Sequence, residues 1–312
     1  MLNETFAAQA AADFDKIPAQ GPYTLGMSNS AIFISLPNLT LTHQDMTSKI
    51  RAMANSSSLA SYLPLEDRSS ASLLLGYRAQ LVAIADLLDN PSAPSLETAF
   101  ATGTAPNAIN LHPLSRGTVR LDPANHLAQP ILDYRAASNP VDFDMYMAHV
   151  RYLRRMISSP ALQEYGAVET APTEAVAVND TALLAYVKEK FTFSFMHPCC
   201  TASMLPLNKG GVVGPDLKVH GTEGLRVVDM SVLPLLPSSH LSQLAYAIGE
   251  KVIFSSLFIF FKSLSFSFLS LLLSRFQVKG NMDANDGLIG CRYNCGGLEG
   301  QVSWGKFKGR GL

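Results

Sequence analysis

The sequence predicts a fold that mixes α-helices with short β-strands, the α+β class, on three observations. Several runs place apolar residues at the spacing of three and four that is typical of a helix buried on one face. Other, shorter runs are rich in β-branched and aromatic residues and are bounded by Gly or Pro. Hydrophobic residues make up 47% of the chain, which is ample for a buried core.

Four elements are predicted in the first ninety residues. A short helix within residues 1–20 ends before a Gly-Pro turn. β-Branched and aromatic content predicts a strand over residues 30–37. A helix follows over about residues 42–60, with Thr42 as a possible N-cap. The clearest helix covers residues 72–90, because Leu and Ala recur at helical spacing and Pro91 stops it.

The chain continues with alternating elements up to about residue 251. They are a strand at 99–104, a turn and strand at 112–122, an amphipathic helix at 139–162, a helix at 179–191 capped by Asn179 or Asp180, an aromatic strand at 191–195, turn–strand pairs at 210–219, a short buried strand at 224–229, and a helix from about Ser239. We find no internal repeat.

Length and charge limit the kind of protein. A chain of 312 residues is long enough for about two domains. The formal net charge is −1, and no basic stripe occurs outside the last few residues, so we expect no nucleic-acid partner. The N-terminus carries acids and no cationic segment followed by an apolar one, so it is not a signal peptide. We expect a cytoplasmic location by default, and secretion stays open if the true N-terminus lies upstream.

The four cysteines do not form a disulfide framework. Cys199 and Cys200 are adjacent, and we do not expect them to pair with each other. Cys291 and Cys295 lack a second pair of Cys or His residues nearby, so we expect no zinc site.

Two histidines, His197 and His240, stand at turn positions and suggest chemistry. Pro198 fixes the turn after His197 and biases its backbone to an extended form, which suits a general base near neutral pH. His240 is expected in the first turn of a helix that Ser238 or Ser239 can cap, where free N–H groups favour an anion or a polarised carbonyl. The alternative is ordinary: such histidines are more often surface or core residues, and Asp229 can equally be a helix or turn cap.

Four short segments follow one another in a fixed order. They are His197-Pro198-Cys199-Cys200-Thr201-Ala202-Ser203-Met204, Gly211-Val212-Val213-Gly214-Pro215-Asp216-Leu217-Lys218-Val219-His220-Gly221, Gly224-Leu225-Arg226-Val227-Val228-Asp229-Met230-Ser231, and Ser238-Ser239-His240-Leu241. In order and spacing they resemble the C-terminal signature of the glucose–methanol–choline (GMC) oxidoreductases, which are flavin enzymes. The resemblance covers about residues 1–251 and is nearest to fungal glucose-oxidase-like and secondary-metabolite branches.

The resemblance implies a substrate domain at residues 1–190, an antiparallel sheet backed by helices, and a signature at 191–251 that completes an FAD-binding domain. It implies FAD as cofactor and a small-molecule alcohol as substrate. By similarity, His197 would take the hydroxyl proton while the hydride goes to the flavin, and His240 would hydrogen-bond the same oxygen. Asp229 and Met230 would lie near the flavin side chain, and the helix starting at His240 and Leu241 would face the flavin ring.

The departures from the family pattern are also informative. The Gly-x-Gly-x-x-Gly fingerprint of the N-terminal Rossmann-like portion is absent, so we expect a truncated chain that binds FAD weakly or not at all by itself. Cys200 replaces the usual Gly, and Gly214 replaces a frequent Asp. The alternative function is a non-catalytic or non-redox remnant, cyclase-like or binding. For Arg116 we favour an ion pair with Asp133 or Asp142 over a substrate contact.

Composition changes abruptly after Lys251. Residues 252–276 are almost only Phe, Ser, Leu and Ile, and a Gly-rich basic end follows. The favoured interpretation is translation into an unspliced intron, because Phe, Ser and Leu share pyrimidine-rich codons. A membrane anchor is the second interpretation, although Lys262 at the centre of the run costs roughly 3 kcal/mol. A buried helix is the third. Sequencing the spliced transcript decides: a properly joined exon encoding these residues would rule out the intron.

Overall fold

The computed structural model describes residues 4–24, 30–100, 107–164, 166–263, 290–295 and 298–303. The chain divides into two compact units, Met1–Gly249 and Glu250–Leu312. In the second unit the described residues continue helix α9 (Leu241–Ser263) and form an antiparallel hairpin of β6 (Gly290–Cys295) and β7 (Leu298–Ser303). Residues 264–276 of the apolar run lie outside the described residues. Our domain boundaries after residues 190 and 251 stay predictions.

The first unit combines helices with two small antiparallel sheets, as the α+β prediction requires. In chain order its described elements before α9 are α1 (Glu4–Phe14), η1 (Pro22–Thr24), β1 (Ser30–Ser35), α2 (Leu36–Leu39), α3 (His43–Asn55), η2 (Leu59–Tyr62), η3 (Leu65–Asp67), α4 (Ala71–Asp89), β2 (Pro94–Phe100), β3 (Ile109–Asn110), β4 (Thr118–Arg120), β5 (Ile131–Asp133), α5 (Pro140–Ile157), α6 (Pro160–Gln163), α7 (Glu174–Ala177), α8 (Asp180–Lys190), η4 (Leu207–Lys209) and η5 (Met230–Val232).

Side-chain caps fix where the main helices begin. The hydroxyl of Ser70 accepts a hydrogen bond from the N–H of Leu73 at the start of α4. Asn139 caps α5, whose first residue is Pro140, and Asn179 caps α8 by accepting from the N–H of Ala182 at 2.9 Å. Each cap satisfies one N–H group that the helix itself leaves without a partner. The structure therefore selects Asn179 over Asp180 as the cap of α8.

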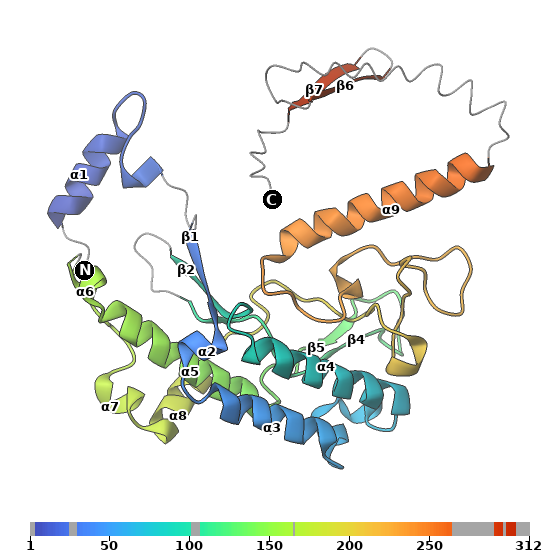
Figure 1. Ribbon diagram of the computed structural model, residues 1–312, viewed down its shortest axis with the longest axis horizontal. Coiled ribbons are helices and arrows are strands. Elements are labelled where there is room, and N and C mark those ends of the chain that lie inside the picture. Colours follow the sequence, from blue (N-terminus) through green and yellow to red (C-terminus); the bar gives the residue numbers. More distant parts are fainter. Residues whose placement is uncertain are drawn as a thin grey trace, which may run out of the picture. The chain divides into compact units, whose positions relative to one another are not determined.

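The core forms where α3 packs along α4 and both face α5 (Figure 1). Ile50 of α3 and Leu81, Ile84 and Leu88 of α4 are all buried there. Among the described helices, α4 is long and apolar enough to cross a membrane by length and composition. Since its apolar residues contribute to this core, we assign α4 to the protein interior.

Gly76 lets the segment around η4 approach α4 closely. A Cβ atom at Gly76 would lie 2.1 Å from the carbonyl oxygen of Lys209, which is far inside van der Waals contact. The glycine in the middle of α4 is therefore required by packing, although it lowers intrinsic helix propensity. This contact attaches the C-terminal signature to the core helix.

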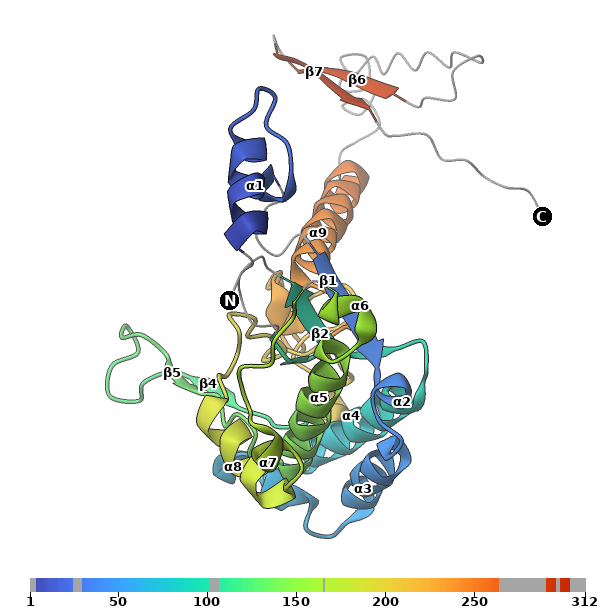
Figure 2. The same ribbon diagram turned by 90° about the vertical axis from the view of Figure 1, so that its left-hand side faces the viewer.

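The main sheet has the strand order β1-β2-β3 and is antiparallel. In its register Phe33 of β1 lies opposite Glu97 of β2. Directly opposed residues project to the same face of a sheet, so these two side chains share a face. The second sheet pairs β4 with β5, and the exposed loop between them projects from the helices (Figure 2).

Three predicted strands are wrong. Residues 191–195 form no strand, because Ser194 and Phe195 have positive φ angles, which no extended strand contains. Residues 224–229 form no regular strand either, and Val228 is 41% exposed. Residues 210–219 make only isolated bridges, such as Val213 with Val219. Short β-branched and aromatic runs thus led us to predict strands where this segment forms loops.

Candidate active site

A large cavity of about 2,310 Å³ in the first unit collects the candidate residues. His197, Cys199, Cys200, His240 and Leu241 all line it. Typical small-molecule sites measure roughly 300–1,000 Å³, so this cavity has room for more than one small ligand. The segments that carry the two histidines, far apart in sequence, therefore both border this cavity.

The imidazole of His197 is held in one orientation by its own loop. Nδ1 donates a hydrogen bond to the carbonyl of Phe195, and the ring stacks on the Phe195 ring at a centroid distance of 6.0 Å and an angle of 8°. A carbonyl can only accept, so Nδ1 carries the proton in the neutral form and Nε2 keeps a lone pair. No described residue bonds Nε2, which leaves it available as a proton acceptor.

The imidazole of His240 contacts a buried carboxylate. Its Nε2 lies 2.5 Å from Oε1 of Glu97, whose side chain is only 8% exposed. The His240 ring also lies 5.6 Å from the Phe33 ring, between centroids. Both partners come from the shared face of β1 and β2. His240 directly precedes α9, so our placement of it within the first helical turn is wrong by one residue.

A second histidine holds the loop that carries His240. His112 is buried, and its Nε2 lies 3.1 Å from the carbonyl oxygen of Pro94 and 2.8 Å from the hydroxyl of Ser238. The carbonyl needs a donor, so Nε2–H is shared between both oxygens. Burial lowers the pKa of His112, which keeps the ring neutral. Ser238, expected as a possible cap of α9, is thus bonded to the sheet region instead.

Asp229 caps a short helical turn. Its carboxylate accepts a hydrogen bond from the N–H of Ser231 at 2.7 Å, at the start of η5. The carbonyl of Met230 accepts from the N–H of Cys200 at 3.2 Å. Asp229 therefore acts as a turn cap, the alternative that we considered for it. Neither Asp229 nor Met230 is among the described residues that line the cavity. Their roles toward a flavin stay predictions.

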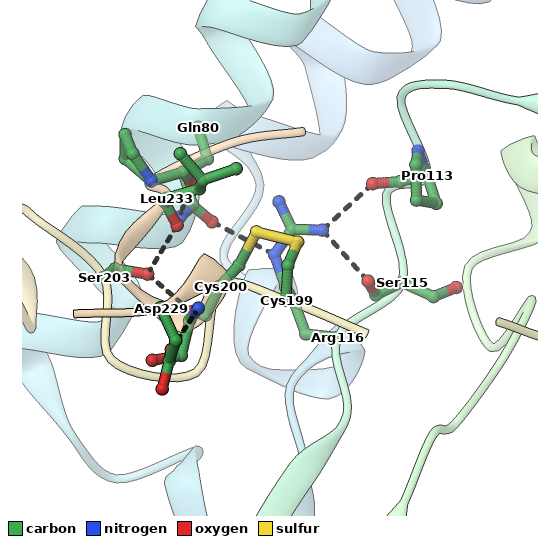
Figure 3. The surroundings of a disulfide bond; sticks show 11 residues. Gln80, Pro113, Ser115, Arg116, Cys199, Cys200, Ser203, Asp229 and Leu233 are labelled. Atoms are coloured by element: carbon green, nitrogen blue, oxygen red, sulfur yellow. Dashed lines mark hydrogen bonds between the residues drawn. A yellow bond between two sulfur atoms is a disulfide. The ribbon is translucent and has the colours of Figure 1, made fainter. Parts of the chain in front are cut away.

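Arg116 and the adjacent cysteines correct two of our predictions. Arg116 makes no ion pair with a described carboxylate: its Nε donates to Gln80, and its Nη1 donates to the carbonyls of Pro113 and Ser115. Cys199 and Cys200 are bonded to each other, contrary to our expectation. Arg116 is among the residues around this disulfide (Figure 3). The backbone carbonyls around Arg116 replace the carboxylate that we expected.

Comparison with known proteins settles the family. A model of the GMC oxidoreductase C-terminal domain matches residues 113–249. Residues 113–249 thus carry the C-terminal domain of the GMC oxidoreductases. It is 38% identical over 143 residues to the dehydrogenase xptC of Emericella nidulans, and 36% identical over 145 residues to a pyranose dehydrogenase of Agaricus campestris. These alignments cover 46% of this chain and 23% and 24% of those GMC proteins, so the chain spans about a quarter of their length.

Solved GMC structures share the fold over more of the chain. A fungal aryl-alcohol oxidase is 59% identical with a TM-score of 0.71, and the match covers 80% of this chain and 42% of that one. An FAD-dependent oxidoreductase from Chaetomium thermophilum is 34% identical with a TM-score of 0.70, at the same coverage. The α+β fold with an antiparallel sheet and helices is therefore confirmed.

The cavity wall fits the ring end of the flavin that the family uses. The N-terminus of α9, with His240, Leu241 and Ser242, opens onto the cavity. Free N–H groups and a partial positive charge at a helix start suit an electron-rich ring carbonyl. The nucleotide end lacks a counterpart, because the sequence contains no Gly-x-Gly-x-x-Gly run.

Sequence reasoning missed Glu97, His112 and Phe33. Glu97 is the single charged residue of β2 and lies two residues before our predicted strand at 99–104; an acid among apolar and small residues is a usable signal of a buried functional carboxylate. Its partner is not readable from sequence, because His240 lies 143 positions away. The register of β1 on β2 sets Phe33 opposite Glu97, and the loop before α9 brings His240 to both.

Proposed function

We propose that this cavity wall binds an aryl alcohol and deprotonates its hydroxyl during an FAD-dependent oxidation. The observation that carries the proposal is the convergence of His197 and of the His240–Glu97 pair on one cavity at the start of α9. Family membership supports the reaction class. The 59% identity to an aryl-alcohol oxidase supports the substrate class.

In this proposal His197 is the general base. Its lone pair on Nε2 accepts the hydroxyl proton, while the Phe195 carbonyl holds Nδ1–H and prevents the ring from turning. When bound, FAD would accept the hydride from the carbinol carbon. Taking the proton and the hydride from the same CH–OH group leaves an aldehyde.

His240 binds the same hydroxyl oxygen in this proposal. Glu97 accepts Nε2–H, so the opposite ring nitrogen, Nδ1, is the one presented to substrate. The carboxylate also stabilises a positive charge on the ring, which helps it donate to a developing alkoxide. Phe33 packs against the ring and restricts its position.

Aromatic side chains shape the rest of the proposed alcohol site. The cavity lining includes Tyr77, Tyr134, Tyr146, Phe191 and Phe195. Aromatic rings pack well against an aryl group, in stacked or edge-to-face geometry. A benzylic alcohol therefore fits this wall better than a sugar, which needs many polar partners.

The finer proposal concerns the cofactor: the chain alone holds FAD weakly, since it has no Gly-rich nucleotide loop. Titrating FAD with the full chain and following flavin fluorescence anisotropy tests this. Weak, incomplete binding is expected, and retention of FAD through gel filtration would contradict it. The alternative, a non-redox remnant, predicts that no alcohol reduces FAD even when the cofactor is in large excess.

Ligand-observed NMR tests the substrate side without the cofactor. With 4-methoxybenzyl alcohol, saturation transfer from the wild-type chain should be reduced in His197→Ala and His240→Ala. His126→Ala, at an exposed position in the loop between β4 and β5, is the matched control. Equal transfer in all four chains would argue against this cavity as the alcohol site. We expect no nucleic-acid partner, given the net charge of −1.

A further inference from the structure

The bonded pair Cys199–Cys200 lies on the wall of the cavity, next to the proposed base. His197 precedes it along the chain, and all three residues line the cavity. Both cysteines are partly exposed, so small molecules that enter the cavity can reach their sulfur atoms. The proposed alcohol oxidation assigns no task to either sulfur.

A guanidinium, that of Arg116, lies beside this pair; Asp142 attracts it electrostatically but makes no hydrogen bond or ion pair with it. Arg116 lines the same wall and is among the residues around the disulfide (Figure 3). Its Nε and Nη1 bond neutral oxygens, and Nη2 has no hydrogen-bond partner among the described residues. A neighbouring guanidinium favours the thiolate form of a cysteine, the nucleophile in thiol–disulfide exchange.

The backbone of the pair is tied to the segment that carries Met230. The N–H of Cys200 donates to the carbonyl of Met230 at 3.2 Å, and the N–H of Ala202 donates to that of Ser231 at 2.9 Å. The hydroxyl of Ser203 donates to the carbonyl of Cys200 at 2.6 Å. Cys200 has φ of 74°, a left-handed conformation that is unfavourable for a non-glycine residue.

We propose that Cys199 and Cys200 form a redox-active dithiol–disulfide site that exchanges with small thiols entering the cavity, with Arg116 stabilising the cysteine thiolate that leaves in reduction and attacks in oxidation. In reduction, a thiolate of a small dithiol attacks one sulfur, the Cys199–Cys200 bond breaks, and a mixed disulfide forms. The second thiolate of the reductant then displaces the protein sulfur. The reductant leaves as a cyclic disulfide, and two electrons and two protons end on the protein as two thiols.

This site acts independently of FAD, so its test does not depend on the proposed alcohol oxidation. Trypsin cleaves after Lys190 and Lys209, and residues 191–209 contain Cys199 and Cys200 but neither Cys291 nor Cys295. Mass spectrometry of that one peptide therefore reports the state of the pair in the full chain.

The first measurement is alkylation with iodoacetamide before and after dithiothreitol. Chain equilibrated with oxidised glutathione, then denatured and alkylated, should yield an unlabelled peptide, and chain reduced with dithiothreitol should yield a peptide labelled on both cysteines. A peptide labelled on both cysteines, or carrying glutathione on each, after the oxidised treatment would overturn the proposal.

The second measurement is the alkylation rate of the reduced, folded chain. Arg116→Gln should slow alkylation about threefold near neutral pH. Without the guanidinium a smaller fraction of the cysteines is thiolate, and this loss outweighs the higher nucleophilicity of each thiolate. Arg116→Lys keeps the charge and should preserve most of the rate. Equal rates in all three chains would overturn the role of Arg116. Should Arg116→Gln fail to fold, the pH dependence of alkylation in the wild type decides. The pH at which the rate is half-maximal must then lie below about 8.5, the ordinary pKa of a cysteine.

Discussion

Oε1 of Glu97 lies 2.5 Å from Nε2 of His240, so a buried acid in the middle of a strand orients a histidine that directly precedes a helix. The two residues come from β2 and from the loop before α9, 143 positions apart. Because the carboxylate is only 8% exposed, losing this partner leaves it without compensation from water. The orientation of His240, the proposed substrate-binding group, thus depends on an intact β2.

Glu97→Gln should lower kcat/KM for benzylic alcohols about tenfold to a hundredfold, with FAD supplied in excess. The amide cannot hold the ring as a charge-assisted acceptor, and small losses of orientation are costly in catalysis. Steady-state kinetics under excess FAD measures the effect. Glu66→Gln, which removes an exposed acid paired with Arg120, is the control and should leave kcat/KM unchanged. Identical losses in both variants would show that Glu97 has no special role.

His149→Leu should stabilise the protein by about 1–3 kcal/mol at pH 7. His149 is completely buried in α5, and among the described residues neither of its ring nitrogens has a hydrogen-bond partner, so its polar atoms are desolvated without compensation. Chemical denaturation with urea measures the difference. A lower free energy of unfolding for His149→Leu would mean that the packing of the imidazole ring contributes more to stability than the desolvation of its nitrogens costs.

The same histidine should make stability depend on pH. Burial lowers the pKa of His149 from 6.5 to about 3, so between these values the unfolded chain binds a proton that the folded chain excludes. The wild type keeps full stability above pH 6.5 and loses it as pH falls toward 3. At pH 5 this loss is about 2 kcal/mol, and His149→Leu should lack it. Parallel loss in His149→Leu and in the wild type would refute the assignment.

Gly76→Ala should destabilise the protein by at least about 2 kcal/mol, because its Cβ would lie 2.1 Å from the backbone oxygen of Lys209. Gly249→Ala is the matched control: Gly249 also lies in a helix, α9, but in the described part of the chain no atom beyond its own neighbours and helix backbone lies within 4 Å of its Cβ position. There the change should be neutral or stabilise by about 0.5–1 kcal/mol. Thermal denaturation of both variants checks the contrast, and equal effects would contradict the close approach of η4 to α4.

The two asparagine caps, Asn139 and Asn179, should contribute different amounts to the free energy of unfolding. Asn139 is buried: its oxygen accepts from the N–H of Val141 and its amide donates to the hydroxyl of Tyr77. Asn139→Ala should therefore cost about 2 kcal/mol, against about 1 kcal/mol for Asn179→Ala at the exposed cap of α8. Urea denaturation midpoints of both variants give the order. The reverse order would show that burial adds nothing at Asn139.

Local sequence signals were enough to predict the long helices. α4 and α5 have helical apolar spacing together with a capping residue, and the structure begins each within two residues of the predicted start. The same reasoning failed over residues 191–195, where a run of aromatic residues suggested a strand. The positive φ angles of Ser194, Phe195 and Met196 arise from the tertiary path of the loop, and no local propensity encodes them.

The site was predictable only in part, for the same physical reason. His197 and His240 carry recognisable neighbours in the sequence, and the structure places both on one cavity. Glu97 and Phe33 become partners of His240 only through the register of an antiparallel sheet. The hydrogen bond from Arg116 to Gln80 likewise depends on long-range packing.

The most direct test of the proposed alcohol oxidation uses the full chain without oxygen, with excess FAD and 4-methoxybenzyl alcohol. The measured quantity is the rate at which the visible flavin absorbance bleaches. The account predicts bleaching by the wild type and a loss of at least about a hundredfold in His197→Ala, the proposed base. Bleaching at the same rate in wild type and His197→Ala, or no bleaching at all, would contradict it.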